Sequence, residues 1–146
     1  MNVALPESVG RLEDQVCFAL YSAARAAQQA YRPLLDDLGL TYPQYLVLLV
    51  LWEQDGQSVS ELGERLHLDS GTLSPLLGRL DEHGFITRER QSTDARRVAA
   101  HLTAEGLALR SRSAEIQHCL RDAVALSPED LTTLRDLSRR FASSDA

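Results

Sequence analysis

The chain of 146 residues has the size of one compact domain, and its formal net charge of −6 makes it acidic as a whole. It contains no run of about 18 apolar residues, which excludes an uninterrupted membrane-spanning helix. Residues 1–16 lack a basic segment followed by an apolar stretch, which argues against a signal peptide, and we expect a cytoplasmic protein with no membrane partner.

Three helices are predicted in the first third of the chain. Residues 11–31 place alanine and larger apolar residues three and four positions apart, the spacing of an amphipathic helix. Pro33 is expected to begin a short second segment that ends at Gly39. Thr41 opens a third helix through residue 54, and its residues 45–52 are apolar nearly all round, which predicts a buried central helix.

Residues 58–103 have the pattern of a winged helix-turn-helix. Ser58 and Glu61 form a capping box before a short helix, and Asp69 caps a longer helix whose inward positions are Leu73, Leu76, Leu77 and Leu80. This second helix ends at Gly84. Pro75 removes one of its hydrogen bonds, from which we expect a bend or a late start. Residues 85–88 and 98–102 are predicted to be two strands that flank a polar loop, the wing.

The exposed polar residues of this motif are candidates for contacting double-stranded operator DNA. Near the start of the second helix they are small and able to reach base edges or phosphates: Ser70, Gly71, Thr72 and Ser74. The longer candidates are Arg79 on the helix, Arg88 on the first strand, and Arg96 and Arg97 at the wing tip, where an arginine can enter a narrow minor groove. Asp94 is expected to orient Arg96 through a two-pronged hydrogen bond.

The charge is distributed unevenly along the chain. Residues 65–97 carry six arginines against five acidic residues, whereas residues 1–64 carry three against nine. An acidic body with a neutral to basic reading surface suits a specific DNA binder with weak non-specific affinity.

Two further helices are predicted after the wing, from Thr103 to about Val124 and from Pro128 to Phe141. Because a small winged module does not need long flanking helices, the first and last helices are expected to interlock with those of a second copy, although packing on their own core is the alternative. The expected fold is mainly α with a small β-wing. Residues 43–102 form the winged helix-turn-helix, and residues 1–42 with 103–146 form a helical homodimerisation region.

The chain resembles the MarR family of winged-helix regulators, and within it the organic hydroperoxide resistance regulators. The wing string DARRVAAHLT matches the family pattern, and LEDQVCFALYSA, TYPQYLVLLVLWE and LDSGTLSPLLGRL support the subgroup. The resemblance implies that a cysteine thiolate held by tyrosine hydroxyls senses an organic hydroperoxide, and that its oxidation releases DNA. It assigns these roles to Cys17 and to Tyr21, Tyr31 and Tyr42, with Cys119 as the resolving cysteine of a two-cysteine subgroup.

The residues themselves support a thiol sensor up to a point. Thiolates are the species that peroxides attack, and Tyr21 lies on the helix face of Cys17. Tyr31 is fourteen residues further, about 21 Å along a straight helix, so a site containing both must be shared between two subunits. Apolar neighbours of Cys17 favour organic over hydrogen peroxide. On periodicity alone, a small buried hydrophobic residue is the better explanation of Cys17, and a core position on its helix is the alternative for Cys119.

Two other functions fit the sequence less well. One is a regulator of the same fold that a small aromatic or phenolic ligand releases from DNA, with both cysteines inert. The other is a thiol peroxidase, which would need a proton donor and a recycling partner at its cysteine; neither is visible, so no enzymatic activity is expected. No cofactor or metal is expected either, because the four histidines have no ligand spacing with a cysteine.

Overall fold

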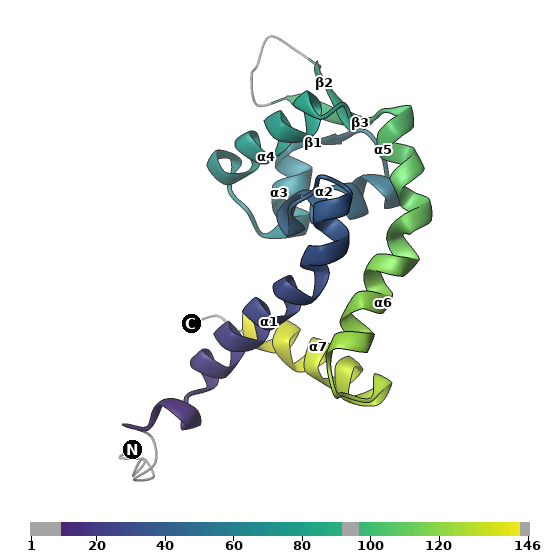
Figure 1. Ribbon diagram of the computed structural model, residues 1–146. Helices are drawn as coiled ribbons and strands as arrows, with labels where there is room; N and C mark the ends of the chain where they lie inside the picture. Colours follow the sequence, from purple (N-terminus) through teal and green to yellow (C-terminus); the bar gives the residue numbers. More distant parts are fainter. Residues whose placement is uncertain (1–9, 92–96, 144–146) are drawn as a thin grey trace, which may run out of the picture.

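The computed structural model, which describes residues 10–91 and 97–143, contains a lobe of three helices and a small sheet, with two long helices extending from it (Figure 1). The extending helices are α1 (Val16–Asp37) and α6 (Ser113–Ala123), which pack against each other. Helix α7 (Pro128–Ser143) lies at the end of this extension, remote from the lobe (Figure 1).

The centre of the lobe is helix α2 (Tyr42–Glu53), as its apolar sequence predicts. Thr41 and Gln44 cap it reciprocally, with the Thr41 N–H donating to Gln44 Oε1 at 3.0 Å. Seven of its residues are buried, among them Trp52, whose indole Nε1 donates to the Gly106 carbonyl at 2.9 Å. That bond ties helix α5 (Ala104–Ala108) to the core of the lobe.

Helices α3 (Val59–Leu66) and α4 (Ser70–Glu82) form the predicted helix-turn-helix. The Ser58–Glu61 capping box is present, and Leu62, Leu73, Leu77 and Leu80 are fully buried. The turn is tight, because His67 adopts the left-handed conformation and a Cβ on Gly63 would lie 2.7 Å from the Leu68 carbonyl oxygen.

Three antiparallel strands in the order β1-β3-β2 form the sheet. The two predicted strands are β2 (Ile86–Arg90) and β3 (Val98–Leu102), paired from Ile86↔Leu102 to Arg90↔Val98. Strand β1 (Gln57–Ser58), which sequence reasoning missed, pairs with the buried Ala99 and Ala100 of β3.

Three helix predictions need correction. Helix α1 starts at Val16, after a 3₁₀ turn at Leu12–Asp14, and it continues through Pro33 to Asp37 instead of stopping. The proline leaves the Gln29 carbonyl without its helical donor, and because both residues are exposed, water can satisfy that carbonyl.

The other two corrections concern α4 and the helix after the wing. Helix α4 does not start late, because Asp69 caps it at Ser70 and Pro75 is accommodated on its exposed side. The helix predicted from Thr103 to Val124 is instead divided into α5, a 3₁₀ segment (Leu109–Arg112) and α6.

Among the described residues, no single helix is long and apolar enough to span a membrane. Helices α1 and α2 reach that length and composition only when joined across a 77° bend, and α2 is the buried helix of the core.

Candidate DNA-reading surface and thiol site

The first turn of α4 presents small polar residues to solvent. Asp69 accepts a 2.7 Å hydrogen bond from the Thr72 backbone N–H, which, with the Thr72 side chain, holds the pKa of the Asp69 carboxyl below its usual value. Ser70, Gly71, Thr72 and Ser74 are all exposed, as predicted for residues that reach base edges or phosphates.

The structure brings residues of α4 and of the wing together. Arg88 on β2 donates from Nε to Asp81 Oδ2 of α4 at 3.0 Å, so this arginine also anchors the wing strand to the reading helix. Ser70, Ser74 and Arg88 line one cleft of about 660 Å³ between α3, α4 and the strands.

Arg90 is an additional candidate for DNA contact. It is exposed, and because strand residues alternate between faces, it shares the face of Arg88. Arg79, Arg90 and Arg97 have no carboxylate partner within the described part of the chain, which leaves their guanidinium groups available to phosphates. The alternation Thr87-Arg88-Glu89-Arg90 is the signal that could have identified Arg90 from the sequence.

Of the three residues predicted at the wing tip, the described part of the chain contains Arg97. Asp94 and Arg96, and with them the predicted two-pronged hydrogen bond, lie outside the described residues. Arg97 is described and exposed, and its carbonyl accepts a 2.8 Å hydrogen bond from the Gln91 N–H.

Cys17 is the second residue of α1 and is exposed in the single chain. Its predicted partner Tyr21 is also exposed, at 59%, and the Tyr21 ring lies under the Arg25 guanidinium at 5.6 Å. Within the described residues, Tyr21 donates no hydrogen bond to Cys17. The start of α1 therefore presents an exposed thiol with apolar neighbours at the surface of the chain.

The other two predicted tyrosines meet at the junction of α1 and α2. The rings of Tyr31 and Tyr42 stack with centroids 5.3 Å apart, and Tyr45 lies against both. Burial raises the pKa of Tyr42, and burial together with Tyr42 and Cys119 raises the pKa of Tyr31. Both hydroxyls therefore stay protonated at neutral pH and can donate hydrogen bonds.

Cys119, half-buried on α6, is among the groups that raise the pKa of Tyr31, and α6 packs against the helix that carries Tyr31. Cys17 is remote from them, because α1 runs uninterrupted from residue 17 to residue 31, a length of about 21 Å. A single chain thus gathers Tyr31, Tyr42 and Cys119 and leaves Cys17 apart.

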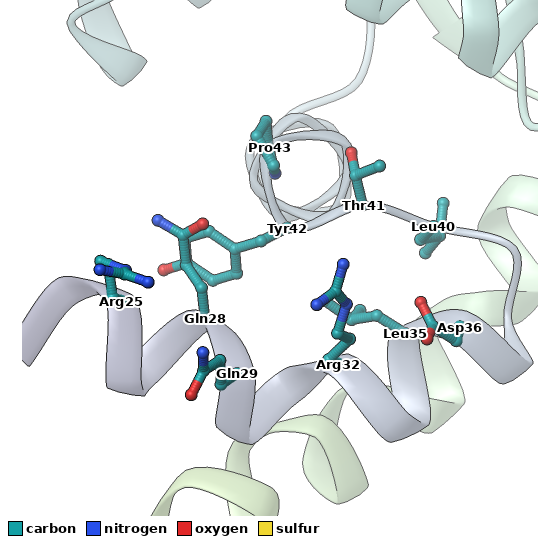
Figure 2. Close-up of a pocket in the computed structure, with 10 residues that line it drawn as sticks. All are labelled: Arg25, Gln28, Gln29, Arg32, Leu35, Asp36, Leu40, Thr41, Tyr42 and Pro43. Atoms are coloured by element: carbon teal, nitrogen blue, oxygen red, sulfur yellow. The ribbon is translucent and has the colours of Figure 1, made fainter.

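A groove of about 330 Å³ opens beside Tyr42, between the second half of α1 and the start of α2. Figure 2 shows Arg32 reaching across it from α1, with Gln28 and Arg25 beside the Tyr42 ring. The remaining lining residues are Gln29, Leu35, Asp36, Leu40, Thr41 and Pro43. In the described ranges, no cluster of three or more potential metal ligands occurs.

The first and last helices, with the residues just before each of them, leave apolar side chains uncovered. At the start of the chain these are Leu12, Val16 and Phe18, and at its end they are Leu126, Leu134, Leu137 and Phe141. The sequence prediction of an apolar stripe on α1 is correct, but one chain does not bury that stripe.

A helix-turn-helix followed by an antiparallel wing, with exposed small polar residues and exposed arginines on one side, defines a winged-helix DNA-binding transcriptional regulator. A profile of the transcriptional regulator SarA/Rot family matches residues 29–112. The organic hydroperoxide resistance transcriptional regulator of Bacillus subtilis (strain 168) is 45% identical over 125 residues, which cover 86% of this chain and 85% of that protein. The chain therefore belongs to the MarR-like SarA/Rot family of winged-helix transcriptional regulators.

Two sets of solved structures extend the comparison. Reduced AbfR bound to DNA is 34% identical, with a TM-score of 0.72 over 90% of this chain and 93% of that one; AbfR is a protein of Staphylococcus epidermidis. AbfR is also solved overoxidised on DNA, with a TM-score of 0.72, and in a disulfide form, with a TM-score of 0.64. PcaV of Streptomyces coelicolor with its natural ligand is 27% identical, with a TM-score of 0.81 over 92% of this chain and 96% of that one. The Bacillus relative and PcaV are transcriptional regulators, and AbfR is solved bound to DNA.

Proposed function

We propose that the protein is a peroxide-responsive repressor. As a homodimer it binds operator DNA while Cys17 is reduced, and it leaves the DNA when an organic hydroperoxide oxidises Cys17. The observation that carries this proposal is that the exposed Cys17 lies apart from Tyr31, Tyr42 and Cys119 in one chain. A site that contains all four residues therefore needs a second subunit. Its similarity to a hydroperoxide resistance regulator and to a regulator solved in several oxidation states supports it.

The dimer follows from the uncovered apolar side chains. Burying them on a second copy contributes about 25 cal/mol per Å² of apolar surface. In this arrangement residues 1–42 and 103–146 form the dimerisation region, and residues 43–102 of each subunit form the winged module. The tyrosine pair of one subunit then receives Cys17 of the other, and the protonated hydroxyls donate hydrogen bonds to its thiolate.

The chemistry proceeds in two balanced steps. The Cys17 thiolate attacks the distal oxygen of the hydroperoxide, the O–O bond breaks, and the alkoxide takes a proton and leaves as an alcohol, with Cys17 as sulfenic acid. The thiol of Cys119 in the partner subunit then attacks that sulfur, which forms a disulfide and releases water. Closing this bridge brings α1 of one subunit and α6 of the other together, because the two Cα atoms must come within about 7 Å.

Oxidation releases the DNA because each winged module is connected to these helices. The bond from Trp52 to Gly106 couples the lobe to α5, which leads into α6. Moving α6 therefore rotates each reading helix away from its half-site. A tenfold loss of affinity requires only about 1.4 kcal/mol.

A gel-shift series on an operator fragment tests the proposal. Reduced wild type should bind, and an alkyl hydroperoxide should release it. Cys17→Ser should bind with similar affinity and stay bound after the same treatment, while the control Ser111→Ala, on the 3₁₀ segment, should behave like wild type. Release of Cys17→Ser by the oxidant would place the sensor at another residue.

A second function is favoured by the groove beside Tyr42 and by the likeness to PcaV, which is solved with its natural ligand. In that case a small aromatic or phenolic ligand releases the DNA and both cysteines are inert. The same gel-shift series separates the two functions, because ligand-driven release would need no oxidant and would persist in Cys17→Ser.

A further inference from the structure

We propose that Pro75 of the reading helix α4 selects an A·T base pair in each operator half-site. Its ring contacts the thymine methyl group, and the Gly71 carbonyl, which the proline leaves without a helical donor, accepts a hydrogen bond from the adenine N6 amino group. The proposal rests on the operator binding proposed above and adds a base preference to it. No DNA contact is predicted for Pro75 from the sequence alone.

Pro75 lies inside a continuous helix, where a proline is unfavourable. Helix α4 runs from Ser70 to Glu82 through this residue. Because a proline has no N–H, the carbonyl four residues earlier, on Gly71, loses its helical hydrogen bond, and the ring crowds that carbonyl. Both residues are exposed, and no side chain of the described residues donates to the Gly71 carbonyl. The helix therefore presents an apolar ring and an acceptor without its helical donor side by side.

The position of Pro75 on α4 points away from the core. The buried Leu73 and Leu77 are each two residues from Pro75, which places them about 200° around the helix axis from it. A residue opposite the core of the lobe is foremost when this helix enters the major groove.

The neighbours of Pro75 on the helix surface allow the ring to reach a base edge. On one flank, the residues one turn before and one turn after it are Gly71 and Gly78, which have no side chain to hold the helix away from the bases. On the other flank, one turn after Pro75, the exposed Arg79 is long enough to reach a phosphate. The backbone of α4 can therefore lie close to the base edges while an arginine beside the ring contacts the DNA backbone.

The chemistry of the two groups selects one kind of base pair. In the major groove, only thymine carries a methyl group, and only adenine and cytosine present an amino donor. An A·T pair supplies both the methyl group for the Pro75 ring and the donor for the Gly71 carbonyl. A G·C pair supplies the amino group of cytosine without a methyl group, so the contact with the ring is lost.

Pro75→Ala removes both reading groups at once, because alanine lacks the ring and returns an N–H to the Gly71 carbonyl. The change also favours the helix, so the Tm should rise while the base preference is lost. Pro33→Ala is the matched control, since Pro33 is also exposed inside a helix but lies on α1. That variant should keep the base preference of wild type.

Base analogues in the operator measure this preference on the reduced protein, without any oxidant. The operator is first selected from a random duplex library. Deoxyuridine then replaces each thymidine, which removes only the methyl group, and purine replaces each adenine, which removes the N6 amino group. At one position of each half-site, wild type should bind about fourfold more weakly to the first analogue and about fivefold more weakly to the second. Pro75→Ala should show neither difference beyond the effect of purine on the duplex itself, which is common to all three proteins.

The possible results separate this inference from the function on which it rests. If no thymine methyl group affects wild-type affinity, or if the same sensitivity survives in Pro75→Ala, the base assignment is overturned and the peroxide-responsive repressor stands. A selection that enriches no sequence would overturn both. A base preference that depends on Pro75, in a protein that no hydroperoxide releases, would support the inference and overturn the redox response.

Discussion

Replacing Gly106 with alanine should destabilise the junction between the winged lobe and the helices that follow it. A Cβ at this position would lie 2.0 Å from the Phe85 carbonyl oxygen and 3.3 Å from a Leu102 methyl carbon. Since the obstacle is backbone, either α5 or the Phe85 peptide must move by more than an ångström. That movement strains the bond from the Thr103 N–H to the Phe85 oxygen, now 3.1 Å, and the bond from Trp52 to the Gly106 carbonyl.

The size of the effect can be worked from these contacts. Overpacking costs about 1–3 kcal/mol, and a buried indole N–H left without its acceptor costs about 1–3 kcal/mol more. The better helix propensity of alanine returns about 1 kcal/mol. We therefore expect a loss of about 3 kcal/mol in unfolding free energy, or a Tm lower by about 6–12 °C for a chain of this length.

Thermal and denaturant unfolding followed by circular dichroism, at equal protein concentration, measure this loss. The chain has one tryptophan, and its emission should shift to the red in the native variant because Trp52 loses its place against α5. Gly78→Ala is the matched control. Its Cβ would meet only the Arg88 Nη1 atom, at 4.0 Å, so that variant should gain about 0.5–1 kcal/mol. A Gly106→Ala protein as stable as wild type would refute the close approach of α5 and Phe85.

Three further outcomes are expected. Burial, with Tyr31 and Tyr42, raises the pKa of Tyr45 to about 12. The free energy of unfolding should therefore be unchanged below pH 10 and fall by about 2–3 kcal/mol as pH rises to about 12. Denaturant titrations of Tyr45→Phe should lack this part of the fall. Asp69→Ala should lower the Tm at neutral pH, because it removes the cap of α4. Since folding lowers the pKa of Asp69, the difference in Tm from wild type should disappear as pH falls below about 4. An unchanged Tm at neutral pH would contradict the cap. Arg96→Ala should weaken specific DNA binding by about 1–3 kcal/mol in fluorescence anisotropy at an unchanged Tm, and parental affinity would argue against a wing contact.

The local signals in the sequence predicted the fold well. Ser58, Asp69 and Thr103 each cap a helix that starts where it was predicted to start, because capping depends on residues only three positions apart. The sequence prediction failed where a secondary-structure element depends on solvent exposure or on a partner far along the chain. Pro33 stays inside α1 because the carbonyl that loses its helical hydrogen bond is on an exposed residue. Strand β1 forms through its pairing with β3, which lies far along the chain.

The candidate site was predictable only in part, for the same reason. Helix geometry was enough to separate Cys17 from Tyr31, and the structure has a continuous α1 between them. The stacking of Tyr31 on Tyr42, the approach of Cys119 to Tyr31, and the groove with Arg32 all depend on how α1, α2 and α6 pack. No spacing along the chain encodes those contacts.

The central claim is that peroxide sensing is shared between two subunits, and non-reducing electrophoresis tests it most directly. After mild treatment with an alkyl hydroperoxide, wild type should run as a covalent dimer that a reductant converts back to monomer. Cys17→Ser and Cys119→Ser should each run as monomer under the same conditions. A wild-type monomer band throughout, with DNA release intact, would contradict the shared disulfide and leave Cys17 sulfenic acid, or its mixed disulfide with a small thiol, as the switch.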